Sequence, residues 1–154
     1  MAGMYYEDFT PGLVIDHAIR RTLTEYDNVL FSALTYNCAP IHIDHEYASK
    51  TLFGKPLMNS MLTLALVNGV GVIETTIGTT LGNLGFEEVK FPKPVFPGDT
   101  IRVRTEILDR RLSKKREDSG IVFFKVQGIN QHGDVVCECR RAGLMLKREY
   151  AIKD

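Results

Sequence analysis

The stretch that decides the fold is residues 59–76, which read NSMLTLALVNGVGVIETT. Wound as a helix, this stretch carries apolar side chains on nearly all of its sides: Met61, Leu62, Leu64, Ala65, Leu66, Val67, Val70, Val72 and Ile73. The apolar run is shorter than the ~20 residues that a membrane-spanning helix requires, and it contains Thr63 and Asn68. A helix that is apolar all round has to be buried by other structure. The sequence therefore predicts one long central helix that the rest of the chain wraps.

Strands that follow this helix in the sequence are expected to cover it. Within residues 101–107, apolar residues and a threonine alternate with charged residues, which is the period-two pattern of a half-buried antiparallel strand. Further strands are predicted at residues 13–23, 86–91, 121–129 and 135–146, with turn signals between the later ones. The order along the chain is one strand, then helices, then four strands in hairpin succession.

This order predicts an α+β domain in which a curved antiparallel β-sheet wraps the long apolar helix, the hot-dog fold. We expect one domain over residues 1–154, because the length is usual for one domain and a hydrophobic content of 44% is enough for one core. Such a sheet leaves an edge strand unpaired, and a second copy of the chain would protect that edge. The expected assembly is therefore a homodimer or a higher oligomer.

The segment between the first strand and the central helix contains short helices. Thr24 stands at a helix N-cap, and a helix of about ten residues follows. Its apolar residues, Val29, Leu30, Ala33 and Leu34, form one stripe that we expect to face a core. Pro40 blocks an ordinary helix, so residues 36–43 are predicted to be a loop. Asp44 is placed to cap a short helix over residues 45–52.

Charge and cysteine content narrow the function classes. The 19 basic residues balance the 19 acidic residues, so no overall field attracts nucleic acid or an anionic membrane, and we expect neither partner. Three cysteines, an odd number, fit a reducing compartment. Because the first residues also lack a basic region followed by an apolar region, no secretory signal is predicted, and the expected location is cytoplasmic.

Several motifs together resemble one known family. They are Pro40-Ile41-His42-x-Asp44 with Tyr47-Ala48, Phe53-Gly54-x-Pro56, Met61-Leu62, and Phe91-x-x-Pro94-Val95-Phe96-Pro97-Gly98-Asp99-Thr100. This set is similar to the signature of the MaoC-like dehydratases, the (R)-specific enoyl-CoA hydratase family. The resemblance spans most of the chain. It implies the hot-dog fold and a hydro-lyase, an enoyl-CoA hydratase or 3-hydroxyacyl-CoA dehydratase. The expected substrate is a short acyl thioester of coenzyme A or of acyl carrier protein, with branched and dicarboxylic acyl groups among the candidates, and no cofactor is expected.

The resemblance also implies site residues, and this sequence departs from several of them. In the family an aspartate and a histidine five residues apart act on a water and on the substrate α-carbon. Here the histidine is His42, but the aspartate position holds Asn37, and the family asparagine two positions later is Ala39. An amide can orient a water but is a very poor proton acceptor, so acid–base chemistry would depend on His42.

Three further positions follow from the same resemblance. Ser60 matches the glycine whose backbone N–H forms the oxyanion hole, and Asn59 replaces the histidine before it. Asn68 matches a serine that supports the active site. Hydration of an α,β-unsaturated thioester needs a base for the water, a proton for the α-carbon and donors for the carbonyl oxygen. Imidazole can perform the first two steps in turn, and the N-terminus of the central helix offers free amides for the third.

Each of these residues could instead have a purely structural role. A histidine after a proline is often a hydrogen-bonded packing residue, and Asn37 fits an Asx turn that shapes the loop before Pro40. Asn59 and Ser60 are good helix caps whatever the function. A buried amide such as Asn68 costs free energy unless it finds partners, so we expect it to face a polar pocket.

Other polar groups are weaker candidates. The acidic and histidine residues of segment 42–46 straddle a loop and a helix start without a standard ligand spacing, so no metal site is predicted. The basic residues of segment 110–116 alternate with acidic ones, which indicates a solvated turn, although they could touch coenzyme A phosphates. His17 and His132 carry no motif.

Two rival functions stay open. A thioesterase on this fold would want a carboxylate on the central helix to activate water, and the one acid there, Glu74, lies near the far end. A non-catalytic protein that binds acyl-thioesters would follow if loss of the aspartate had turned a hydratase pocket into a receptor.

Overall fold

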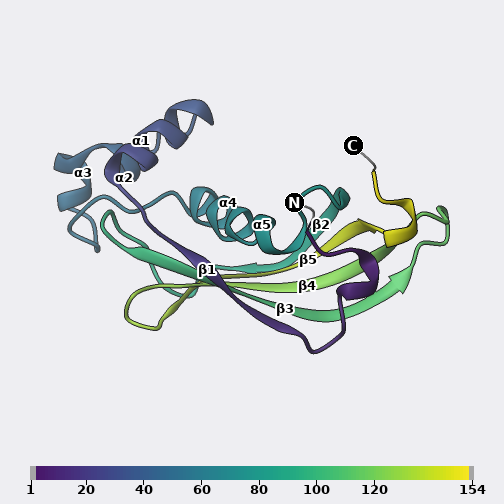
Figure 1. Ribbon diagram of the computed structural model, residues 1–154. Coiled ribbons are helices and arrows are strands. Elements are labelled where there is room, and N and C mark those ends of the chain that lie inside the picture. Colours follow the sequence, from purple (N-terminus) through teal and green to yellow (C-terminus); the bar gives the residue numbers. More distant parts are fainter. Residues whose placement is uncertain (1–2, 153–154) are drawn as a thin grey trace.

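A five-stranded antiparallel sheet is the main body of the protein in a computed structural model that describes residues 3–152 (Figure 1). The strands are β1 Val14–Thr22, β2 Thr80–Lys90, β3 Thr100–Leu112, β4 Ser119–Ile129 and β5 Val135–Leu146. Their order across the sheet is β1-β3-β4-β5-β2. The alternation read in the sequence is confirmed, since Ile101, Val103, Thr105 and Ile107 are all buried. The α+β hot-dog fold is thus confirmed.

The position of β2 differs from the prediction. It begins at Thr80 instead of residue 86, and it pairs with β5 at the far edge of the sheet instead of forming a hairpin with β3. The connection from β2 to β3 contains Pro92, Pro94 and Pro97, which cannot donate to a strand ladder. Only β3, β4 and β5 therefore follow one another as hairpins.

The central helix lies on the concave face of the sheet (Figure 1). It is α4, Ser60–Val70, and a separate turn, α5 Val72–Thr75, follows it. We expected one helix over residues 59–76, but the chain divides at Gly71, where an added Cβ would lie 3.0 Å from Nε2 of the buried His17. A glycine at this point lets the helix approach β1 closely.

The wrapping of the central helix is incomplete in a single chain. Val67 is fully buried, and it packs onto Gly128 of β4, where a side chain would clash with it. On the other side, however, Met61 is 55% and Ile73 is 52% exposed. The sheet covers one side of the helix, so the prediction of burial on all sides is wrong for the isolated chain.

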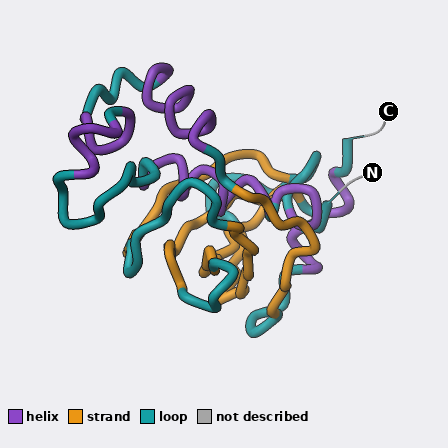
Figure 2. Tube along the Cα trace, turned by 90° about the vertical axis from the view of Figure 1, so that its left-hand side faces the viewer, coloured by secondary structure: helices purple, strands orange, loops and turns teal. Residues whose placement is uncertain are grey.

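Three short helices form a group to one side of the sheet, and we call residues 25–57 the helical segment (Figures 1 and 2). They are α1 Glu25–Leu34, α2 Pro40–Ile43 and α3 His45–Ser49. Thr24 caps α1 as predicted, because its hydroxyl accepts a hydrogen bond from the Asp27 N–H at 3.3 Å, and the Thr24 N–H donates to the Asp27 carboxylate at 2.8 Å. Asp44 caps α3 as predicted, by accepting from the Tyr47 N–H.

Three predictions for the helical segment are wrong. Residues 36–43 are not entirely a loop, because Pro40 occupies the first position of the turn α2, where a proline's missing N–H is harmless. Helix α3 ends at Ser49, before residue 52. The apolar stripe of α1 does not face a core, since Leu34 is 72% exposed; the buried face carries Asn28 and Ser32 instead.

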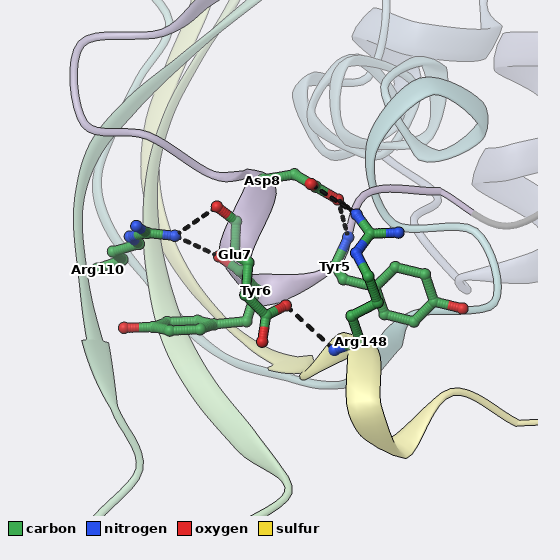
Figure 3. Close-up of polar contacts among 6 residues, drawn as sticks. All are labelled: Tyr5, Tyr6, Glu7, Asp8, Arg110 and Arg148. Carbon is green, nitrogen blue, oxygen red and sulfur yellow. Dashed lines mark hydrogen bonds and ion pairs between the residues drawn. The ribbon is translucent and has the colours of Figure 1, made fainter.

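The two ends of the described chain are tied together by short 3₁₀ turns, Tyr6–Asp8 and Arg148–Tyr150 (Figure 3). Arg110 on β3 donates to the carbonyl oxygens of Tyr6 at 2.8 Å and Glu7 at 2.7 Å. Arg148 donates to both carboxylate oxygens of Asp8 at 2.6 Å. Arg110 therefore has a structural role, whereas the exposed Lys114 and Lys115 fit the predicted solvated turn.

Within residues 3–152 no helix combines the length and the apolar character needed to cross a membrane.

Candidate functional site

His42 lies in α2, the short second helix of the helical segment, and its ring is held in a defined orientation. Its Nδ1 lies 2.8 Å from the backbone carbonyl oxygen of Leu57. Because a carbonyl can only accept, Nδ1 must carry the hydrogen, and in the neutral ring Nε2 is then the free acceptor. No partner for Nε2 is found among the described residues, and the side chain is only partly buried. This is the arrangement that a general base requires.

A buried amide that the sequence reading missed fixes this arrangement. Asn28 on α1 is fully buried, and its Nδ2 donates to the carbonyl oxygens of His42 at 2.8 Å and Leu57 at 3.0 Å. Its Oδ1 accepts a hydrogen bond from the Asn59 N–H at 2.8 Å. One side chain thus ties the histidine turn to the start of the central helix. The available signal was the polar pair Asn28 and Ser32, spaced i, i+4 on the face of α1 opposite its apolar stripe.

Helix α4 begins at Ser60, three residues after Leu57. Asn59 is its N-cap, with Oδ1 accepting from the Met61 N–H at 3.0 Å, and the side chain is 2% exposed. Ser60 is the first helical residue, and its N–H has no acceptor in the part of the chain that is described. A helix start of this kind favours negative charge.

A pocket of about 230 Å³ opens at this helix start. It is lined by Phe53, Leu57, Met58, Ser60, Thr63, Phe91, Pro92, Lys93, Pro94, Val95 and Val136. Leu57 connects the two groups, since its carbonyl holds His42 while the residue also lines the pocket beside Ser60. An apolar pocket with few polar groups is the usual form of a small-molecule site.

Asn37 has a local partner. Its Oδ1 accepts from the Ala39 N–H at 3.1 Å, which is the Asx turn that the residue type suggested. It lines a second pocket, of about 320 Å³, with Val29 and Cys38. No hydrogen bond joins Asn37 to His42 among the contacts of residues 3–152. Asn37, just before α2, and His42, within α2, are therefore close in sequence but not joined by a hydrogen bond in the described structure.

Asn68 does not face the polar pocket that we expected. Its Nδ2 donates to the Leu64 carbonyl oxygen at 2.9 Å and lies 3.7 Å from Sγ of Cys139 on β5. The side chain is partly buried between helix and sheet. Asn68 thus marks the part of the concave face where α4 contacts β5.

A second pair of acidic and basic side chains lies inside the protein. His17 on β1 is buried, and its Nδ1 contacts Glu74 while its Nε2 lies 2.8 Å from the Thr105 hydroxyl. Glu74 also accepts from the Ala18 N–H at 3.4 Å. Both histidine nitrogens are occupied, so His17 has no free acceptor. Glu74, the carboxylate that a thioesterase would use, is committed to this contact.

The remaining candidate groups are the buried cysteines and the metal-binding side chains. Burial, together with the neighbouring Cys139 and Glu138, raises the pKa of Cys137 to about 12. Burial also raises the pKa of Cys139, against the hydrogen bond from Asn68. Neither thiol is a nucleophile at neutral pH. Over residues 3–152, no group of three or more histidine, cysteine or acidic side chains is arranged to hold a metal ion.

Comparisons with known proteins agree with this geometry. Residues 8–125 match the family described as "MaoC like domain". The chain is 29% identical over 150 residues to the mesaconyl-CoA hydratase of Cereibacter sphaeroides, covering 97% of this chain and 43% of that protein. It is 29% identical over 147 residues to the β-methylmalyl-CoA dehydratase of Chloroflexus aurantiacus, covering 96% of this chain and 41% of that one. The chain therefore spans less than half the length of these relatives.

A solved structure shows the same fold. The MaoC-like dehydratase of Rhodospirillum rubrum superposes with a TM-score of 0.83 at 28% identity, and the match covers 95% of this chain and 99% of that chain. The likeness extends over nearly the whole of both proteins, so it includes the helical segment as well as the sheet.

Proposed function

Because this chain belongs to the MaoC-like domain family, we propose that it is a hydro-lyase that adds water to, or removes it from, a short acyl-CoA thioester. The observation that carries this proposal is the fixed imidazole of His42, whose Nδ1 is bound to the Leu57 carbonyl oxygen. The substrate class is supported by the names of the relatives, a mesaconyl-CoA hydratase and a β-methylmalyl-CoA dehydratase.

The proposed hydration uses two groups of this chain. Nε2 of His42 takes a proton from a water as the water oxygen forms a bond to the β-carbon. The electron pair of the double bond moves toward the thioester, and negative charge develops on its carbonyl oxygen. The free N–H of Ser60, at the positive end of α4, would stabilise that charge. The imidazolium then returns the proton to the α-carbon, which completes the addition of one water.

The remaining predicted residues have supporting roles in this proposal. The usual catalytic aspartate is replaced by Asn37, whose amide would orient the water but could not take its proton. Asn59 positions the Ser60 N–H by capping α4, and Asn68 would support the site indirectly, through its contact with Cys139 between α4 and β5.

The assembly and location are also proposals. We infer a homodimer, because β2 is an edge strand whose apolar residues Leu81, Leu84 and Phe86 are 41%, 52% and 41% exposed. A second copy paired along β2 would cover them. The thiol carrier is coenzyme A or acyl carrier protein, and the cytoplasm fits the three free cysteines.

One alternative function has a specific observation in its favour. A non-catalytic acyl-thioester binding protein would not need a carboxylate beside the histidine, and Asn37 provides none. Its amide oxygen is occupied by the Ala39 N–H, which fits a residue that only shapes the loop.

The test is the loss of absorbance of the conjugated thioester when purified protein meets crotonyl-CoA and a panel of branched and dicarboxylic enoyl-CoA thioesters. Mass spectrometry would check that the product has gained one water. We expect turnover that disappears in His42→Ala and persists in His132→Ala, which changes an exposed histidine on the loop between β4 and β5. If the wild-type protein is inert on every thioester while Asn37→Asp gains activity, the binding-protein alternative replaces the hydro-lyase.

A further inference from the structure

Arg20 on β1 and Arg102 on β3 lie opposite each other on the outer face of the sheet, the face away from α4. The two residues are direct partners in the antiparallel ladder. Ile101 and Val103, the neighbours of Arg102 along β3, are buried in the core, so the alternation of side chains turns Arg102 outward. Arg20, directly opposite, points to the same side. Because like charges in such a position destabilise a strand pair, the sheet would be more stable without one of them.

Neither guanidinium has a full counter-charge in the described chain. The carboxylate of Asp16 is bound by Arg104, whose Nε and Nη2 donate to its two oxygens at 2.7 and 2.9 Å. Nη1 of Arg102 lies 4.0 Å from the same carboxylate, which is beyond hydrogen-bonding distance. Among residues 3–152, Arg20 forms no ion pair, and neither it nor Arg102 donates a side-chain hydrogen bond. Both side chains therefore keep their donors and most of their charge for another anion.

A pocket beside the two arginines has room for such an anion. Its volume is about 380 Å³, and it is lined by both arginines, by Thr100 and by loop residues 130–133 between β4 and β5. None of the described residues that line it is an aspartate or a glutamate. The nearby carboxylate of Asp99 is already bound, since Gln131 Nε2 donates to it at 2.7 Å and the Phe96 N–H at 2.9 Å. The pocket is therefore positively charged, with no acidic side chain in its wall.

We propose that Arg20 and Arg102 together bind the phosphate group of a small phosphorylated ligand. One arginine is enough for a carboxylate, as the binding of Asp16 by Arg104 shows. A terminal phosphate has three oxygens and nearly two negative charges, which suits two guanidinium groups that each donate parallel hydrogen bonds. His132 is not part of this site, because its Nε2 already lies 3.1 Å from a neighbouring amide nitrogen. The site shares no residue with the pocket at the start of α4, so the inference does not depend on the proposed function.

The arginine side chains can report binding directly. Inorganic phosphate would be titrated into ¹⁵N-labelled protein at constant ionic strength while the Nε–Hε resonances of the arginines are followed. Those of Arg20 and Arg102 should shift along one binding curve. Arg102→Gln should weaken the affinity roughly 10- to 100-fold, the range for hydrogen bonds to a charged group. The matched control is Arg140→Gln, which removes an arginine on the same face that pairs with Glu88 at 3.3 Å and should leave the affinity unchanged.

Thermal denaturation separates a ligand site from a structural role. In chloride buffer of low ionic strength, Arg102→Gln should melt no lower than wild type, because the substitution removes a repulsion between like charges. Phosphate should raise the melting temperature of the wild-type protein and have a much smaller effect on the variant. A lower melting temperature of Arg102→Gln with an unchanged affinity for phosphate would show that the arginine supports the sheet, and it would overturn the proposal.

Coenzyme A and its form without the 3′-phosphate distinguish two sources of the phosphate group. Tighter binding of coenzyme A, with the difference removed by Arg102→Gln, would identify the site as one for the coenzyme's own phosphate. Equal binding of the two, with inorganic phosphate still shifting both arginine resonances, would identify a separate phosphorylated metabolite as the ligand. If neither inorganic phosphate nor coenzyme A shifts the resonances of Arg20 and Arg102, or if sodium chloride shifts them equally, the proposal is wrong.

Discussion

His42 and His17 lie in two regions of the molecule that use the same side chain differently. In the helical segment, His42 has one nitrogen bound to a backbone carbonyl and the other free, and the ring is partly exposed. In the body of the sheet, His17 is buried and both of its nitrogens contact side chains, Glu74 and Thr105. A histidine can transfer a proton only through a free nitrogen that reaches the substrate. The contrast therefore supports the proposed catalytic role of His42 and gives His17 a structural role.

The same contrast holds for the forces that maintain each region. The sheet and α4 are held by a continuous apolar core that includes Phe124, Val67 and Met145. No described residue of the helical segment belongs to that core, and the hydrogen bonds of Asn28 join the segment to the start of α4. Burial of apolar surface is spread over many contacts, whereas this polar link is concentrated in one side chain. Single substitutions should therefore affect the two regions differently.

The largest expected effect is on the rate in His42→Ala. Loss of the general base should lower the hydration rate by about 1000-fold, within the range for general acid–base catalysis. Steady-state kinetics on the best thioester of the panel would measure it. Circular dichroism should show an unchanged fold, because the side chain is only partly buried. A rate within a factor of three of wild type would contradict the assignment.

Asn28→Ala should have the largest effect on stability. The substitution leaves three backbone groups of the helical segment and the α4 cap without their partner, and the free energy of unfolding should fall by about 3 kcal/mol. Urea denaturation would measure this, and the folded variant should also show a lower kcat because His42 is less well positioned.

Ser32→Ala is the matched control for Asn28. Ser32 lies one turn away on the same buried face of α1, but its hydroxyl has no hydrogen-bond partner in the described chain. Its removal should leave stability unchanged or slightly higher. Equal losses in the two variants would show that packing on this face, and not the amide of Asn28, holds the segment.

His17→Ala should reduce stability without reducing the chemistry. Thr105 and Glu74 would lose their shared partner, and the free energy of unfolding should fall by about 2 kcal/mol. The hydration rate of the folded fraction should stay at the wild-type value. A rate loss comparable with that of His42→Ala would break the division of roles between the two histidines.

The smallest expected effect is that of Thr24→Ala, which removes the cap of α1 and should cost about 1 kcal/mol. The pKa of Asp27 connects this cap to pH: burial raises it, but the hydrogen bonds from Thr24 and Arg21 outweigh burial and lower it. A carboxylate with a lowered pKa stabilises the folded state above its unfolded pKa, and this contribution is lost as the pH falls through the folded pKa. The difference between wild type and Thr24→Ala in thermal denaturation should therefore shrink in acid.

Elements marked by a local sequence pattern, such as alternation or a helix cap, were predictable from the sequence. The alternation around Val103 predicted β3, and the caps Thr24 and Asp44 predicted two helix starts. The outward-facing stripe of α1 and the division of the central helix at Gly71 were not predictable, because they depend on which other segment lies nearby.

The candidate site was predictable only in part, for a related physical reason. The family resemblance indicated His42 and Ser60 by position, and no periodicity marks either. The carbonyl oxygen of Leu57 orients the His42 ring, and the side-chain amide of Asn28 binds the backbone of both His42 and Leu57. The arrangement therefore depends on contacts between residues that are distant in sequence.

The most direct test of the central claim is to determine which nitrogen of His42 carries the proton. Two-bond ¹⁵N–¹H correlation spectra of the wild-type protein distinguish the two neutral tautomers of each histidine. Our account predicts that Nδ1 of His42 is protonated, bound to the Leu57 carbonyl, and that Nε2 is unprotonated and free to accept a proton from water. A neutral His42 with its proton on Nε2 would contradict the account, because the nitrogen that we propose as the base could not then accept a proton.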